Sequence, residues 1–102
     1  MDFKIVWTPL ARADLREIVS YIARDNPEAA RRVGQRILAA VEVLCSMPEL
    51  GRVVPERRGP HIREVIRGNY RIVYRVRKER RVVEVWRIWH GARGTPRLVD
   101  PA

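Results

Sequence analysis

The stretch 61-HIREVIRGNYRIVYRVRKERRVVEVWRIWH-90 decides the fold of this 102-residue chain. Val, Ile, Tyr and Trp dominate it and favour strands, while Gly68-Asn69 and Lys78-Glu79 interrupt it where hairpin turns are expected. We therefore predict three antiparallel strands joined by two short turns. The arginines within these strands predict an exposed sheet face rich in guanidinium groups, which is the first candidate for a binding surface: Arg63, Arg67, Arg71, Arg75 and Arg87.

The length of the first turn determines which arginines share a face. A two-residue turn at Gly68-Asn69 would set Ile66 opposite Arg71 and mix apolar with basic side chains on both faces. A three-residue turn over 67–69 would instead pair Ile66 with Tyr70. We favour the longer turn, because it separates core from solvent and leaves three arginines together on one side: Arg63, Arg71 and Arg75.

The last strand, over 82–89, is apolar on both faces, which predicts a central position but leaves its orientation open. An even number of residues in the preceding turn, for example 77–80, puts Arg71 and His90 on the same side. Glu84, Trp86 and Ile88 then share that basic face, and His90 lies roughly 13 Å along the sheet from Arg71. An odd number directs His90 toward the helices.

Before this stretch, the sequence predicts a short strand over 3–7 and two helices. Thr8 and Asn26 are suitable N-caps, and each precedes a proline at the first helical position. Apolar residues recur at helical spacing through both segments, and Gly34 is expected where the helices come close. The order β-α-α-β-β-β predicts an α+β fold, with an antiparallel helical hairpin packed on one sheet. Residues 47–60 are expected to form an irregular connection.

The length predicts one domain over 1–102, with an extended C-terminal tail over 91–102. The sequence contains neither a signal-type run nor an apolar stretch of membrane-spanning length, so we expect a soluble, cytoplasmic protein. A single cysteine excludes an internal disulfide, and two distant histidines provide no metal-ligand set. No nucleotide-binding loop is present, and no cofactor is expected.

The net charge of +9 comes entirely from the second half of the chain. Residues 1–50 contain seven Lys or Arg and seven Asp or Glu, whereas residues 51–102 contain fourteen and five. This asymmetry favours a phosphate-bearing or acidic protein partner that meets the sheet and tail. The alternative is an arginine-rich surface that serves only solubility.

Several short motifs occur together in one order: Trp7-Thr8-Pro9, Ala13-Asp14-Leu15, Tyr21-Ile22-Ala23, Asp25-Asn26-Pro27-Glu28-Ala29-Ala30, 48–52, Pro55-Glu56, Arg63-Glu64, Tyr70-Arg71-Ile72-Val73-Tyr74 and Trp89-His90-Gly91-Ala92-Arg93. Over residues 3–93 the chain resembles the RelE/ParE superfamily of toxins from type II toxin–antitoxin systems. The resemblance implies the α+β fold expected above and a neighbouring antitoxin, which the basic second half predicts to be acidic. It also implies a hetero-oligomer of the two proteins, without a membrane partner.

The branches of this superfamily differ in their targets. ParE-like members poison DNA gyrase, whereas RelE-like members are endoribonucleases that cut mRNA on the ribosome. The Asp25-Asn26-Pro27 turn, the Gly51-Arg52 loop and the ending at residues 90–93 look more like the ParE branch. Inhibition of growth through gyrase is therefore the favoured function, with mRNA cleavage as the alternative. An inactive toxin that still binds its antitoxin is the second alternative.

The resemblance to RelE-like nucleases implies a possible catalytic set of Glu56 as base, Arg71 as phosphate clamp and His90 as acid. Gly91 departs from that pattern, which has a further functional side chain there. Glu64 is expected to neutralise Arg71 or Arg75, and Trp86 could stack on a base or belong to the core or an antitoxin contact. The candidate binding residues are Arg63, Arg71, Arg75, Trp86 and Arg93.

Overall fold

The computed structural model describes residues 2–54 and 61–91. Its elements in chain order are β1 (Lys4–Trp7), α1 (Pro9–Ala23), α2 (Pro27–Val43), β2 (Arg52–Val53), β3 (Ile62–Arg67), β4 (Tyr70–Arg77), the 3-10 turn η1 (Lys78–Arg80) and β5 (Val82–His90). The predicted α+β order is confirmed, with one addition, because β2 lies in the connection that was expected to be irregular. Glu56, Arg93 and all of the predicted tail except Gly91 lie outside the described residues.

Both helices begin where the sequence predicted. The Thr8 hydroxyl accepts a hydrogen bond from the Ala11 N–H at 3.2 Å, and the Asn26 side-chain oxygen accepts one from the Ala29 N–H at 3.1 Å. A proline follows each cap at the first helical position, where its missing N–H costs nothing. The Thr8 hydroxyl also donates to the Val85 carbonyl oxygen at 3.0 Å, so this cap fastens the start of α1 to β5.

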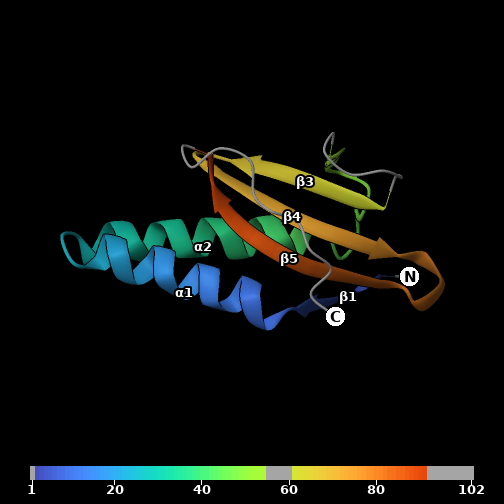
Figure 1. Cartoon of the computed structure of the whole chain (residues 1–102), viewed down its shortest axis with the longest axis horizontal. Coiled ribbons are helices and arrows are strands. Elements are labelled where there is room, and N and C mark those ends of the chain that lie inside the picture. Colours follow the sequence, from blue (N-terminus) through green and yellow to red (C-terminus); the bar gives the residue numbers. More distant parts are fainter. Residues whose placement is uncertain (1, 55–60, 92–102) are drawn as a thin grey trace.

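The two helices lie side by side beneath one face of the sheet (Figure 1). Their close approach explains Gly34, since a Cβ at this position would lie only 3.3 Å from Val19 Cγ2. The sheet order is β1-β5-β4-β3-β2, which confirms the central position of β5. All neighbouring pairs are antiparallel except β1 with β5, so the sheet is mixed.

The predicted three-residue first turn is wrong. Arg67 pairs with Tyr70, so the turn contains only Gly68 and Asn69, and Ile66 lies opposite Arg71. Gly68 adopts a φ of +58°, whereas Asn69 does not have a positive φ. This is the pattern of a type II′ turn, which favours glycine at its first central position and matches the twist of the flanking strands. The turn geometry therefore outweighs the separation of apolar and basic side chains.

The second turn has four residues, 78–81, because Arg77 pairs with Val82. Its even length puts Glu84 on the same face as Arg71, as expected, directly opposite Arg75. A β-bulge then follows: Val73 pairs with Arg87 while Tyr74 pairs with Val85, so Trp86 is an extra residue in β5. A bulge reverses the alternation of side chains beyond it. The expectation that Ile88 and His90 share the face of Arg71 is therefore wrong.

The sheet contributes to apolar clusters on both of its faces. On the helix-facing side, α1 and α2 cover residues that include Ile72, Val85 and Ile88, and a neighbouring cluster includes Leu44 and Tyr74. On the opposite side, which we call the outer face, four buried residues form a smaller cluster: Val54, Ile62, Val73 and Trp86. The outer face is thus partly a core surface and not only a solvated one.

Gly51 fastens the connection after α2 to the sheet. It is buried, and its N–H donates to the Tyr74 hydroxyl at 2.8 Å. A Cβ on Gly51 would lie 2.5 Å from the Glu64 carbonyl oxygen and 2.7 Å from the Tyr74 hydroxyl. Backbone must therefore move if any side chain is added here.

We predict that Gly51→Ala lowers the free energy of unfolding by about 2–3 kcal/mol, as expected for overpacking at a site that cannot relax freely. Urea denaturation measures the change. Gly34→Ala is the matched control: its new methyl group is tight against one side chain, but alanine gains about 1 kcal/mol of helix propensity over glycine. Equal losses in the two variants would contradict the role assigned to Gly51.

Candidate functional site

The strand arginines are divided between the two faces of the sheet. Arg71 and Arg75 lie on the outer face, as predicted, but Arg63 lies on the helix-facing side, where it pairs across strands with Tyr74. The expectation that Arg63 joins the other two is therefore wrong, as a direct consequence of the two-residue turn. The Arg63 guanidinium donates to the Gly51 carbonyl oxygen at 2.8 Å and lies 3.6 Å from the Glu49 carboxylate.

Glu64 is the only charged residue among the fully buried side chains of the described chain, with a side-chain exposure of 0%. Arg71 Nε donates to Glu64 Oε1 and Arg52 Nε donates to Glu64 Oε2, each at 2.6 Å. The Nη2 atoms of both arginines also contact the same oxygens. The expectation that Glu64 neutralises Arg71 is confirmed, and Arg52 is a second partner that the sequence analysis did not anticipate.

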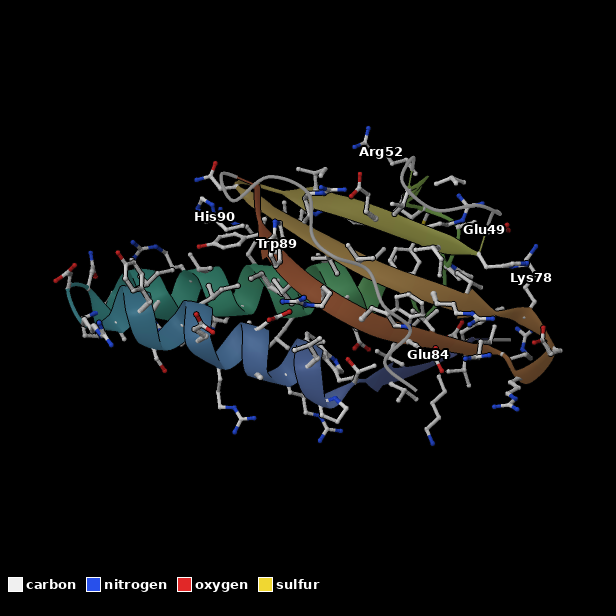
Figure 2. The ribbon with its side chains drawn as sticks, in the orientation of Figure 1. Glu49, Arg52, Lys78, Glu84, Trp89 and His90 are labelled. Carbon is white, nitrogen blue, oxygen red and sulfur yellow. The ribbon has the colours of Figure 1, made fainter. Side chains whose placement is uncertain are left out.

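The side chains of this cluster differ greatly in exposure. The Arg71 side chain is 13% exposed and that of Arg52 is 64% exposed. Figure 2 places Arg52 at the edge of the sheet that lies away from the helices. The Arg71 guanidinium is thus held against a buried carboxylate beneath the surface, in place of the solvent-facing position that the arginine pattern predicted.

Two further ion pairs neutralise arginines of β4 and β5. Arg87 donates to both Asp14 carboxylate oxygens, at 2.8 and 3.1 Å, and Asp14 also accepts the Ile88 N–H at 3.0 Å. Because β1 ends at Trp7, the edge of β5 is open here, and Asp14 of α1 occupies it. The other pair joins Arg77 Nε to Glu84 at 2.8 Å.

Trp86 is placed in the outer-face core. Its residue exposure is 1%, and its indole N–H donates to Glu84 Oε1 at 3.3 Å. Trp86 is therefore a core residue, the second of the alternatives given above, and a base could not stack on its ring without rearrangement. Trp89 is more exposed, and the Arg87 guanidinium lies over its ring at 4.9 Å from the centroid.

His90 lies at the end of β5, next to Trp89 (Figure 2). It pairs across strands with Tyr70, and the two rings meet edge to face with their centroids 5.2 Å apart. Because Arg71 pairs with Trp89, His90 is one residue away from the Arg71 position along the sheet, and the predicted four-residue separation is wrong. The two side chains nevertheless lie on opposite faces, since Tyr70 faces the helices.

A groove of about 380 Å³ opens between α1 and the end of β5. Its walls carry aromatic and ionisable side chains, including Glu17, Tyr21, Tyr70, Trp89 and His90. The Asp14–Arg87 pair forms part of this lining. His90 therefore belongs to a groove beside the helices. It also lines, together with Arg71, a second hollow of about 300 Å³ at the Tyr70 end of β4. Glu56, the third member of the candidate nuclease set, lies outside the described residues.

Several features limit the chemistry of the described residues. No group of three or more His, Cys, Asp or Glu side chains within residues 2–54 and 61–91 could hold a metal ion. In the same ranges, none of the helices has the length and apolar character to cross a bilayer. Burial raises the pKa of the Tyr74 hydroxyl, which therefore stays protonated as it accepts the Gly51 N–H.

The comparisons with known proteins agree on one family. Residues 5–94 match the family model of the ParE toxin of type II toxin–antitoxin systems. The toxin RelE1 of Caulobacter vibrioides is 33% identical over 93 residues, which cover 89% of this chain and 96% of that protein. The putative toxin Y4kP of Sinorhizobium fredii is 35% identical over 98 residues, covering 94% of this chain and 96% of that protein.

A solved structure gives the same result for the fold. A chain from the chromosomal ParDE toxin–antitoxin system of P. aeruginosa superposes with a TM-score of 0.70 at 25% identity, covering 86% of this chain and 95% of that chain. Relatives in sequence and structure thus carry both RelE and ParE names.

We predict that Glu64→Ala lowers the free energy of unfolding by about 3–5 kcal/mol, because it removes the carboxylate that pairs with a largely buried guanidinium. Glu28→Ala is the control, since the Glu28–Arg31 pair has side chains that are 65% and 64% exposed. Its loss should stay below about 0.5 kcal/mol. Comparable denaturant midpoints for the two variants would argue against a buried ion pair at Glu64.

Proposed function

The chain belongs to the RelE/ParE superfamily of toxins from type II toxin–antitoxin systems, and we propose that it inhibits growth by binding DNA gyrase. The observation that carries this proposal is the position of Arg71. Its guanidinium donates two N–H groups to Glu64, so the side chain that a nuclease would need as a phosphate clamp is already paired with a carboxylate. A toxin that acts by binding a protein does not need that clamp.

The position of His90 bears on the choice between the two targets. General acid catalysis requires the acid within hydrogen-bond reach of the leaving oxygen, while the clamp holds the adjoining phosphate. By strand pairing, His90 lies on the helix-facing side of the sheet and Arg71 lies on the outer face, but both side chains border one hollow of about 300 Å³ at the Tyr70 end of β4. The gyrase proposal therefore rests on the pairing of Arg71 with Glu64, and the shared hollow favours the alternative function.

The partner that neutralises the toxin is proposed to be an acidic antitoxin. The related chain from P. aeruginosa belongs to a toxin–antitoxin system, and the second half of this chain carries nine more basic than acidic residues, fourteen against five. An acidic segment that wraps this surface would be steered and oriented by complementary charge. A hetero-oligomer of toxin and antitoxin, in the cytoplasm, follows from this proposal.

The alternative function is ribosome-dependent cleavage of mRNA. It is favoured by the similarity to RelE1 and by the accessible groove in which His90 lies beside Tyr70. In that case Arg71 would have to exchange Glu64 for a phosphate on the ribosome. An inactive toxin that retains only antitoxin binding is the third possibility.

We predict that the purified chain inhibits supercoiling by DNA gyrase and leaves mRNA on programmed ribosomes uncut. Expression of the same chain in cells without the antitoxin should arrest growth. In the supercoiling assay, His90→Ala should retain its inhibitory effect within about threefold, because inhibition by binding requires no proton transfer from His90. His61→Ala is the matched control, since His61 is exposed.

A cut in the decoding site that disappears in His90→Ala and persists in His61→Ala would refute the gyrase proposal and favour the nuclease. Failure to arrest growth, together with tight antitoxin binding, would identify an inactive toxin.

A further inference from the structure

The cluster around Glu64 has more positive than negative charge, and both carboxylate oxygens of Glu64 are occupied by arginine N–H groups. One carboxylate serves two guanidiniums, so the three side chains carry a formal charge of +1. Each arginine directs Nε and Nη2 at one carboxylate oxygen. The same edge of a guanidinium can donate two hydrogen bonds to the oxygens of a phosphate. Glu64 therefore occupies, on Arg71, a position that an RNA phosphate would use.

The local sequence places Glu64 between its two partners. Glu64 lies directly opposite Arg52 on β2 and opposite Val73 on β4, which makes Arg71 its diagonal neighbour across the β3–β4 pair. Long side chains at diagonal positions are within reach of one another. Arg52 is held in place because the preceding residue, Gly51, is packed against the Glu64 carbonyl group.

Stability alone does not account for a carboxylate in this position. A buried ion pair contributes little relative to well-packed apolar residues of similar volume, since desolvation offsets the attraction. The outer face already contains an apolar cluster of Val54, Ile62, Val73 and Trp86, into which further apolar side chains could extend. The charge of Glu64 instead changes what Arg71 can bind.

We propose that Glu64 is a specificity-determining residue that prevents Arg71 from binding nucleic-acid phosphate and so keeps the outer face from acting as an RNA site. This inference deepens the proposed function and rests on it in one respect, namely that the target is a protein. Glu64 acts through Arg71 and is not itself a target-binding group.

The first test measures the binding of a fluorescent single-stranded RNA to the full-length protein by anisotropy at low salt. Glu64→Gln preserves the shape of the side chain and removes its charge, so the ion pair that holds the Nε edge of Arg71 is lost and phosphate can compete for that edge. We expect the affinity to rise about tenfold, as one charge-assisted contact allows, and the salt dependence to steepen by about 0.7 in log–log slope. Adding Arg71→Gln to this variant should abolish the gain.

Glu79→Gln is the matched control. It makes the same change in net charge in the same half of the chain, but at an exposed position in η1. An equal gain in affinity for Glu79→Gln would overturn the proposal, because net charge alone would then explain the result. No gain in a folded Glu64→Gln protein would also overturn it.

A second measurement keeps the proposal testable if Glu64→Gln does not fold. In the wild-type protein, the ¹H–¹⁵N signal of Arg71 Nε should remain in place when RNA is added at low salt, while the signal of the exposed Arg80 shifts. A shift of the Arg71 signal with bound RNA would contradict the blocking role of Glu64.

These outcomes are separate from those of the gyrase assay. A toxin that inhibits gyrase but gains no RNA affinity in Glu64→Gln would retain the proposed function and lose this inference. A toxin that gains RNA affinity but has no effect on gyrase would lose the proposed target and retain the role of Glu64.

Discussion

The buried carboxylate of Glu64 is the constraint on which the outer face of the sheet depends. A charge removed from water must be compensated by hydrogen bonds and opposite charge, and Glu64 obtains both from Arg52 and Arg71. Arg52 reaches it only because the short strand β2 pairs with β3, and β2 follows the buried Gly51. Residues 51–53 are thus fixed to the sheet both by the Gly51–Tyr74 hydrogen bond and by the pairing of Arg52 with one buried carboxylate.

The second constraint is the bulge at Trp86. One extra residue in β5 places the indole in the outer-face cluster and turns the following residues over, so that Ile88 joins the core beneath the helices. It also moves His90 from the face of Arg71 to the groove beside α1. Since a bulge changes the direction of every later side chain, this position decides which candidate residues can meet.

The parts of the fold that were predictable from sequence depend on short-range interactions. The caps at Thr8 and Asn26 need only residues three positions away, and helical periodicity identifies the apolar side of α2. The errors arose where distant residues decide the outcome. The bulge places Trp86 in a cluster with Val54, Ile62 and Val73, and no composition signal at Trp86 distinguishes it from a regular strand residue. The three-residue turn at Gly68 follows from the assumption that strand arginines face water.

That assumption failed for a physical reason that also bears on function. An arginine in a strand can be buried when an acidic residue lies within reach. Three acidic residues pair with strand arginines in this way: Asp14, Glu64 and Glu84. Asp14 comes from a helix 73 positions away in sequence from Arg87, so its pairing was not visible in the strand pattern. Neutralised guanidiniums contribute little to a long-range field, because each is cancelled by its neighbour within a few ångströms. The positive charge available to partners therefore comes more from exposed side chains outside these pairs, such as Arg80 and Lys4, than from the arginines that first drew attention to the sheet.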